Sequence, residues 1–256
     1  MLVLKFGGAS VATPESFCKI AEIVVEQAAH AGNVVVVVSA MGDTTDQLFD
    51  LAHRVNPTPP KRELDMLVTA GERISIALLA MALAARGKEA ISFTGSQSGI
   101  ITDETHSDAK IIDVQPRRLL TVLQKRQIAI VAGFQGVSRK GEITTLGRGG
   151  SDTTAVALAI ALKSPEVIFY KDVSGVFDAD PKLTPQARLI PHLSYEEAFQ
   201  LMSTGHPVLH PRSVKLAKEN NVCFSIRSFF TPFQEGTFIG ERGKSLSQKY
   251  EETLES

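Results

Sequence analysis

The chain has 256 residues, of which 43% are hydrophobic and 21% are charged, a composition that supports one large buried core and excludes global disorder. Its 27 basic and 28 acidic side chains leave a formal net charge of −1, so nothing in the charge balance indicates nucleic acid or a membrane surface as a partner. Cys18 and Cys223 show neither disulfide-framework nor zinc-site spacing, and there is no signal peptide or apolar run long enough to cross a bilayer. We therefore expect a cytoplasmic enzyme that acts on small molecules.

Residues 2–39 are predicted to form a β-α-β unit. Thr13-Pro14-Glu15 combines an N-cap residue, a first-turn proline and a first-turn acid, and apolar side chains then recur at helical spacing. The continuous run Val34–Val38 is typical of a strand that is buried on both faces of a parallel sheet. This strand is therefore expected near the centre of the sheet.

Strand-like and helix-like segments alternate along the rest of the chain. Strands are predicted at residues 90–93, 128–132, 167–170 and 222–226, and helices near 63–86, 114–125, 152–163, 194–204 and 212–220. Ser194 and Glu197 have the spacing of a capping box at one helix start. The alternation predicts a mostly parallel, three-layer α/β domain. Residues 241–256 are polar and charged without a core pattern, which predicts a tail or a cut linker.

The first candidate ligand motif is Lys5-Phe6-Gly7-Gly8, where the first predicted strand ends. Open α/β sheets bind ligands at this edge. Two glycines let a backbone approach phosphate oxygens closely, and a lysine supplies a compact cation. A plain glycine turn after a surface strand explains the motif equally well by itself, because a glycine pair is a weak signal.

The second candidate motif is the glycine-rich segment 145–154, which leads into a predicted helix. A helix N-terminus favours anions, Arg148 can grip a carboxylate with two parallel hydrogen bonds, and Asp152 can cap the helix or orient a phosphate-binding lysine. In the alternative interpretation Ser151 and Asp152 are simple caps and Arg148 is a solvated side chain. The glycines beside Arg148 favour the ligand site.

Three further segments are ambiguous by themselves: residues 39–46 after the valine strand, 71–75 inside an apolar helix, and 171–182 after a later strand. Glu72 either lies in solvent, as most helical glutamates do, or points into a cleft and holds an ammonium group. Residues 171–182 also fit a β-hairpin with Gly175 in its turn.

In this order the five segments resemble the amino-acid kinase family, and most closely the bacterial aspartate kinases. The resemblance runs from Leu2 to about Gly240, and its other motifs are Ser98–Asp103, Val131–Gly136, Ser194–Glu197 and His210–Ser213. It implies a three-layer α/β/α sandwich around a mostly parallel eight-stranded sheet, the carbamate-kinase-like fold. Residues 1–240 would form the catalytic domain, with the amino acid in the N-terminal part and ATP in the C-terminal part.

The resemblance also implies a reaction, in which ATP with Mg²⁺ phosphorylates the side-chain carboxylate of L-aspartate to L-aspartyl 4-phosphate, the first step toward lysine, threonine and methionine. Lys5 and Asp152 would be the catalytic residues, with Asp152 orienting Lys5. The amino-acid site would contain Ser39, Thr45, Glu72, Arg148, Gly149 and Ser151, with Glu72 on the ammonium group and Arg148 on a carboxylate. The ATP site would contain Lys5, Phe6, Gly7, Gly8, Ser39, Ser151, Lys171, Asp172, Phe177, Asp180 and Lys182. No residue is assigned to a metal site.

The sequence departs from the family pattern mainly on the nucleotide side. The family usually has threonine where this chain has Ala9 and Lys171, and tyrosine where it has Phe177. It usually has arginine at the position of Lys182 and lysine at the position of Pro207. Proline offers neither a charge nor an N–H donor, so a second cation for ATP is missing. Either Lys171 or His206 replaces it, or the chain is a weakened kinase or a non-catalytic amino-acid-binding relative. A kinase for a related small acid or a carbamate is a further alternative.

Aspartate kinases commonly continue into paired ACT regulatory domains, and the sequence up to Ser256 contains none. The chain is then an unregulated form, a catalytic subunit with a separate regulatory subunit, or a shortened chain. A homodimer is an additional candidate assembly. Nucleic acid and membranes are not expected as partners.

Overall fold

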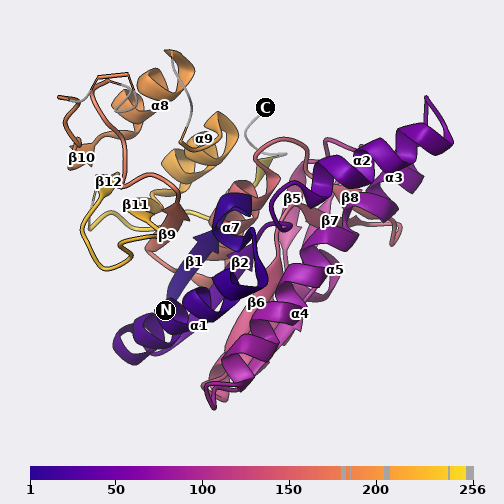
Figure 1. Ribbon diagram of the computed structural model, residues 1–256, viewed down its shortest axis with the longest axis horizontal. Helices are drawn as coiled ribbons and strands as arrows, with labels where there is room; N and C mark the ends of the chain where they lie inside the picture. Colours follow the sequence, from indigo (N-terminus) through magenta and orange to yellow (C-terminus); the bar gives the residue numbers. More distant parts are fainter. Residues whose placement is uncertain (180–182, 185, 205–207, 242, 252–256) are drawn as a thin grey trace.

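An eight-stranded sheet forms the centre of the molecule (Figure 1). The computed structural model describes residues 1–179, 183, 184, 186–204, 208–241 and 243–251, without the side chains of 202–204. In spatial order the strands are β10 (His192–Leu193), β12 (Thr237–Ile239), β11 (Cys223–Ser228), β9 (Glu166–Lys171), β1 (Leu2–Phe6), β2 (Val34–Val38), β6 (Ile128–Ala132) and β3 (Ala90–Phe93). All neighbours run parallel except β11 and β12. The predicted sheet, mostly parallel with eight strands, is confirmed.

The central strand β2 shows how the sheet is sandwiched between two helical layers. All five of its valines are buried. Val35 and Val37 belong to the core shared with α7 (Gly150–Leu162), α6 (Arg117–Gln124), α8 (Tyr195–Thr204) and α9 (Pro211–Asn220). Val34, Val36 and Val38 belong to the core shared with α1 (Pro14–Ala31) and α4 (Ala70–Ala84). Because successive side chains of a strand point to opposite faces, this division confirms the predicted three layers.

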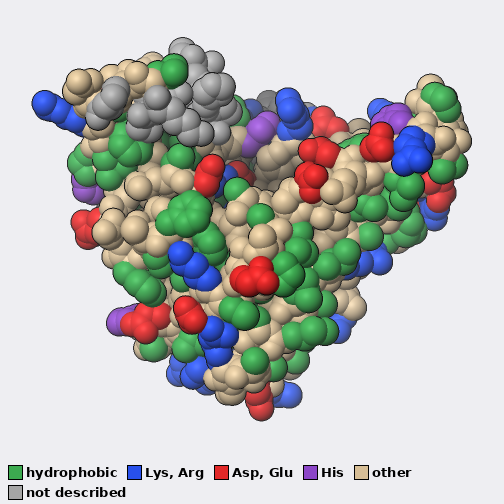
Figure 2. Space-filling view, viewed as in Figure 1, with side chains coloured by type: hydrophobic (Ala, Val, Ile, Leu, Met, Phe, Trp, Pro, Cys, Tyr) green, Lys and Arg blue, Asp and Glu red, His purple; other side chains and the backbone are tan. Residues whose placement is uncertain are grey.

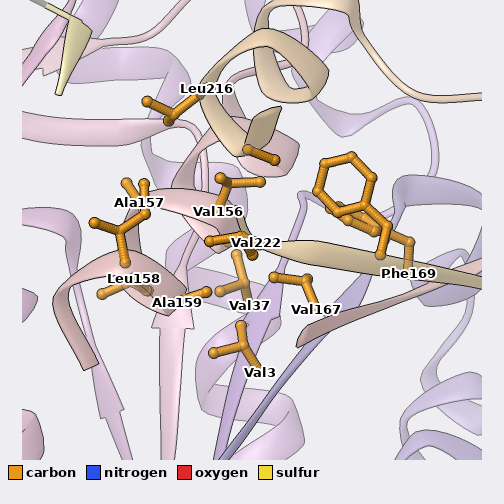
Figure 3. Packing of buried hydrophobic residues seen from close by; sticks show 14 of the residues in the cluster. Val3, Val37, Val156, Ala157, Leu158, Ala159, Val167, Phe169, Leu216 and Val222 are labelled. Atoms are coloured by element: carbon orange, nitrogen blue, oxygen red, sulfur yellow. The ribbon is translucent and has the colours of Figure 1, made fainter. Parts of the chain in front are cut away.

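Helix α7 lies against the centre of one sheet face, with its residues packed on Val3, Val37 and Val167 (Figure 3). All of its residues except Ala161 are buried, so the helix is apolar on every side after its first turn. The helix therefore begins inside the protein, close to the carboxyl ends of the strands. This placement brings Ser151 and Asp152 to the edge of the sheet where ligands are expected.

The predicted helix starts are confirmed where the sequence carried capping signals. The side chain of Thr13 accepts a hydrogen bond from the amide of Ser16, with Pro14 in the first turn of α1. The amide of Ser194 donates to Glu197 Oε2 at 2.8 Å and the amide of Glu197 donates to Ser194 Oγ at 3.2 Å, the two bonds of a capping box.

A second, four-stranded sheet was not predicted from the sequence. It contains β5 (Ile111–Val114), β4 (Ile100–Thr102), β7 (Gln135–Ser138) and β8 (Ile143–Thr145). Two short helices and one longer, exposed helix were also missed: η1 (Gly8–Val11), α5 (Gly95–Ser98) and α2 (Thr44–Val55), the last without a buried residue. Strands of three or four residues are too short for a side-chain period to stand out.

The helix predicted near residues 63–86 is divided into α3 (Lys61–Val68) and α4. Contrary to the sequence interpretation, residues 61–84 are long and apolar enough, by length and composition alone, to cross a membrane. Half of the apolar window is buried in this fold, and α4 packs against α1 and the sheet. These contacts are those of a core helix.

The C-terminal segment, residues 243–251, packs against α9. Asn220 exchanges two hydrogen bonds with the backbone of Lys249, at 2.9 and 2.7 Å. Leu246 and Tyr250 pack against the core on the α7 side of the sheet. The sequence interpretation as a charged tail or cut linker did not include this packing, because the two apolar side chains are too few to form a pattern.

Candidate active site

A cavity of about 980 Å³ lies at the carboxyl ends of β1 and β2 and at the N-terminus of α7. Figure 2 shows the upper side of the molecule hollowed between two lobes, with charged side chains of both signs at the rim. The residues predicted for the amino-acid clamp, Thr45, Glu72, Arg148 and Gly149, all line the cavity. So do Lys5, Gly8, Ser39, Ser151 and Asp152 from the predicted phosphate site. Residues from Lys5 to Asp152, far apart in the sequence, thus line one cavity.

Lys5 and Asp152 form a buried ion pair at one end of the cavity. Nζ of Lys5 lies 2.5 Å from Oδ1 of Asp152, and the two side chains are 5% and 7% exposed. Burial lowers the pKa of Lys5 to about 8, against the attraction of Asp152. Burial alone would raise the pKa of Asp152, but the ammonium groups of Lys5 and Lys171 hold it at about 2. The pair is therefore charged near neutral pH, with Asp152 fixing the direction of the Lys5 ammonium group.

Lys171 brings a second ammonium group to the same carboxylate. It is the last residue of β9, the strand beside β1, and its Nζ lies 3.2 Å from Oδ2 of Asp152. Its side chain is 17% exposed and passes over the ring of Phe169. Two cations share one anion, so the cluster carries a net positive charge where the strands end.

The other predicted nucleotide residues divide into three groups. Phe6 is fully buried and stacks on Tyr170 with a centroid distance of 4.7 Å, so its ring belongs to the core. Asp172 is exposed and Phe177 is half-buried in an isolated bridge with Leu189, and neither lines the cavity. Asp180 and Lys182 lie outside the described residues, as do His206 and Pro207. Lys171 does not line the cavity either, but its ammonium group contacts the lining residue Asp152, a contact that Asp172 and Phe177 do not make.

The glycine pair after β1 packs closely on the loop after β2. The amide of Gly42 donates to the carbonyl of Gly8 at 3.3 Å, and a Cβ on Gly8 would lie 3.4 Å from the carbonyl oxygens of Ala40 and Gly42. A Cβ on Gly7 would lie 3.4 Å from Nζ of Lys5. The small residues thus leave the space beside the Lys5 ammonium group open.

Glu72 carries a buried carboxylate that is only half satisfied. The residue is 2% exposed on α4, and its Oε1 accepts a hydrogen bond from the amide of Ala40 at 3.1 Å. Its Oε2 has no hydrogen-bond partner within the part of the chain that the structure describes. Burial raises the pKa of Glu72 to about 8, although the Ala40 amide and Lys5 oppose this shift. A buried acceptor without a donor is costly, so this oxygen is suited to a cationic ligand group.

Gly71 allows Glu72 to reach this position. A Cβ on Gly71 would lie only 2.7 Å from Cβ of Ala40, so any larger residue would push α4 away from the loop after β2. The close approach brings Glu72 within hydrogen-bonding distance of the Ala40 amide. The lack of a side chain at Gly71 therefore allows the neighbouring Glu72 to reach the Ala40 amide.

Arg148 lies on the turn that precedes α7. The residue is exposed, and no ion pair involving it is found among the described residues. Gly149 follows it with φ at +72°, and a Cβ there would lie 2.2 Å from Cβ of His210. Only glycine fits this left-handed position against His210. The turn thus brings an unpaired guanidinium group to the cavity beside the N-terminus of α7, an arrangement that attracts anions.

Several cavity residues were not assigned a role from the sequence, among them Asp108, His210, Arg212 and Glu251. His210 caps α9 by accepting a hydrogen bond from the amide of Arg212, and burial followed by the charge of Arg212 lowers its pKa. The pair His210-Pro211, a cap followed by a first-turn proline, was the available signal for this helix start. The contacts of Arg212 with distant segments left no signal in the sequence.

The fold and the cavity define a three-layer α/β protein with an anion-binding site at the strand ends. The sequence profile of the amino acid kinase family matches residues 1–228. The chain belongs to the amino acid kinase family, as the resemblance of its motifs implied.

The similar proteins narrow the comparison to one branch of the family. The chain is 52% identical over 240 residues to an aspartokinase of Mycolicibacterium smegmatis, covering 93% of this chain and 57% of the relative. It is 49% identical over 241 residues to an aspartokinase of a Bacillus species, covering 94% of this chain and 58% of the relative. The chain thus spans somewhat more than half the length of these relatives.

Solved structures agree with this placement. The aspartate kinase from Synechocystis matches with a TM-score of 0.84 and 42% identity, over 96% of this chain and 41% of that one. Aspartokinase III of Escherichia coli, in complex with aspartate and ADP, matches with a TM-score of 0.83 and 26% identity, over 95% of this chain and 65% of that one. A UMP kinase from Bacillus anthracis shares the fold, with a TM-score of 0.68 at 19% identity.

Proposed function

We propose that this chain transfers the γ-phosphoryl group of ATP to the side-chain carboxylate of L-aspartate, giving L-aspartyl 4-phosphate, the first step toward lysine, threonine and methionine. The observation that carries the proposal is the placement of an unsatisfied carboxylate oxygen, Oε2 of Glu72, in the same cavity as the Lys5–Asp152 pair. One end offers a partner for an ammonium group and the other a partner for phosphate. The relatives named aspartokinase support this assignment.

The amino-acid end is assigned by charge. Oε2 of Glu72 accepts hydrogen bonds from the substrate ammonium group, which removes the cost of an unpaired buried acceptor. Arg148 holds the α-carboxylate with parallel hydrogen bonds, beside Gly149 and Thr45. Two opposite charges at fixed separation select an α-amino acid over a simple dicarboxylic acid.

The phosphate end is assigned by charge and by backbone geometry. Lys5 contacts the transferred phosphoryl group, and Asp152 holds its ammonium group in place. Gly7, Gly8, Ser39 and Ser151 surround the phosphates, with Ser151 in the first turn of α7. Lys171 adds the second positive charge, an assignment supported by its contact with Asp152.

Mg²⁺ enters this proposal with the nucleotide. Among the described residues no group of three His, Cys, Asp or Glu side chains has the geometry of a metal site. This fits Mg²⁺ in phosphoryl transfer, because the ion commonly keeps several waters and binds through substrate phosphates with one or two carboxylates. When bound, it would neutralise charge on the phosphate oxygens.

The chain's own residues supply position and charge rather than proton transfer. The attacking carboxylate is already ionised at neutral pH, so no general base is required. Glu72 and Arg148 align it with the phosphorus atom, and Lys5 stabilises the charge that spreads over the phosphoryl oxygens in the transition state. All of the residues with these roles lie within residues 1–240, which we propose as the catalytic domain. Cytoplasmic location, a homodimer and a separate regulatory subunit stay predictions.

A coupled ADP-release assay tests the proposal. L-Aspartate, L-glutamate, N-acetylglutamate and no acceptor are compared at saturating Mg·ATP. Preferred release with L-aspartate supports the proposal, and release with another acid or none contradicts it. Calorimetric titration with Mg·ATP covers the case of a non-catalytic relative, because absence of binding at millimolar nucleotide rules out a kinase.

A further inference from the structure

Arg212 joins three separate walls of the cavity. It lies in the first turn of α9 with a side chain that is 19% exposed. Nη1 donates to the carbonyl of Leu146, at the start of the glycine-rich turn, and lies 3.5 Å from Oδ1 of Asp108. Nη2 donates to the carbonyl of Ala109 at 2.6 Å. One guanidinium group thus connects α9, the loop before β5 and the turn that carries Arg148.

The C-terminal segment supplies the anion that fixes this guanidinium group. Glu251 is 8% exposed, and its carboxylate accepts from Nε of Arg212 and, at 2.9 Å, from Nη2. Its Oε2 also accepts from the amide of Ile111 at 2.7 Å, at the start of β5. All five N–H donors of Arg212 have an acceptor in this arrangement, which holds the planar group in one orientation.

Glu251 is itself held by the rest of its segment. The amide of Ser247 donates to the carbonyl of Asn220, and Asn220 also clasps the backbone of Lys249. Leu246 and Tyr250 pack against the core. Docking of residues 243–251 on α9 therefore determines whether a carboxylate stands beside Arg212.

We propose that Glu251 is a positioning residue that couples docking of the C-terminal segment to ligand affinity in the cavity. The inference rests on the proposed function, because it takes the Arg148 turn and the Asp108 loop as walls of an amino-acid site. With Glu251 in place, Arg212 holds both walls; without it, Arg212 loses its buried counter-charge and turns toward water. Because coupling between two sites is reciprocal, a ligand in the cavity also strengthens docking of the segment.

The first test is a binding measurement on purified full chains. Glu251→Gln removes the charge and keeps the shape, and we expect the Kd for L-aspartate in the presence of Mg·ADP to rise about tenfold, with the Kd for Mg·ADP changed less than threefold. Glu241→Gln is the matched control, because Glu241 lies just before this segment and its exposed carboxylate pairs with Lys244 at the surface. Arg212→Lys, which keeps the charge but cannot contact all three walls, should weaken aspartate binding like Glu251→Gln.

The second test needs no variant, so it is independent of any folding defect. Hydrogen exchange of residues 243–251 is measured in the wild-type chain with and without L-aspartate, and we expect aspartate to slow exchange in this segment several-fold. Unchanged exchange, together with an aspartate Kd in Glu251→Gln within twofold of the wild type, overturns the coupling while leaving the proposed function intact. Absence of aspartate binding by the wild type contradicts the proposed function and the coupling together.

Discussion

At the phosphate end of the cavity the carboxylate of Asp152 contacts two ammonium groups, whereas at the amino-acid end Oε2 of Glu72 contacts no donor in the described part of the chain. At the first end every charged group has a partner within the protein, so the cluster keeps its geometry without a ligand while retaining one excess positive charge. The second end contains an unsatisfied acceptor, and binding of a cation relieves the cost of leaving it ionised and buried. We therefore expect the affinity for the amino acid to depend most on Glu72. The rate of phosphoryl transfer should depend most on Lys5.

The largest expected effect follows from removal of Lys5. Lys5→Ala removes the ammonium group that stabilises charge on the transferred phosphoryl group, and loss of one such donor typically costs a hundredfold or more. We expect turnover to fall by about 10³-fold or more, measured as ADP release with L-aspartate. Lys171 still pairs with Asp152, so the fold should persist.

Lys88→Ala is a suitable control for this variant, because Lys88 is exposed and lies outside the cavity. Circular dichroism and the melting temperature establish that both variants are folded. Near-normal turnover in a folded Lys5→Ala chain contradicts the assignment of Lys5 as the catalytic cation.

A second large effect is expected at Glu72, with opposite consequences for binding and stability. Glu72→Gln removes the charge that holds the substrate ammonium group, so the Kd for L-aspartate should rise about a hundredfold, within the range for a buried charged hydrogen bond. The same change should stabilise the fold. The folded-state pKa of Glu72 is raised to about 8, so the wild type loses stability as pH rises from the unfolded value near 4.5 toward 8. Calorimetry of binding and the melting temperature at pH 8 measure the two effects.

Glu26→Gln provides the comparison for Glu72→Gln, since Glu26 is exposed on α1 and lies 3.8 Å from His30. We expect Glu26→Gln to leave both the aspartate Kd and the melting temperature nearly unchanged. A Glu72→Gln chain that binds aspartate normally, or melts at a lower temperature than the wild type, contradicts the account of an unsatisfied buried carboxylate.

The difference between the two ends also explains what the sequence could reveal. The valine run of β2 and the capping signals before α1 and α8 predicted the layers correctly, because burial on two faces and helix capping are local patterns. That Asp152 orients Lys5 was predicted from the resemblance of the chain's motifs, in their order, to those of the amino-acid kinase family. No local pattern indicated that Arg212 contacts Glu251, because that contact depends on the folded path of two distant segments.

The sequence also left the place of Lys171 open, and the structure puts its ammonium group at Asp152. The sequence showed lysine where the family usually has threonine. The direction of the Lys171 side chain, however, depends on the parallel pairing of β9 with β1. The interpretation of residues 171–182 as a β-hairpin is not tested over its whole length, because residues 180–182 lie outside the described part. Within the described part, Phe177 forms an isolated bridge with Leu189.

A smaller effect is expected from Lys171. Lys171→Met removes one of two cations beside the phosphates, so the Kd for Mg·ATP should rise about tenfold while the Kd for L-aspartate changes little. Lys171→Arg keeps the charge and should retain most of the affinity. Calorimetric titration of both variants with Mg·ATP and with Mg·AMP measures the effect, and the loss should be greater for ATP. An equal loss for the two nucleotides would falsify contact between Lys171 and the terminal phosphates.

The smallest expected effect is the pH dependence of kcat/KM for L-aspartate, which reports groups of the free enzyme. Glu72 must be ionised to bind the ammonium group, and its pKa is raised to about 8 by burial, so activity should rise with pH up to that value. Lys5 must be protonated, and burial lowers its pKa to about 8, so activity should fall above it. Two such groups give a narrow maximum near pH 8, with kcat/KM about threefold lower at pH 7. In Glu72→Gln the limb below pH 8 should disappear while the limb above it stays. A wild-type profile that is flat from pH 6.5 to 9 contradicts the assignment of both groups.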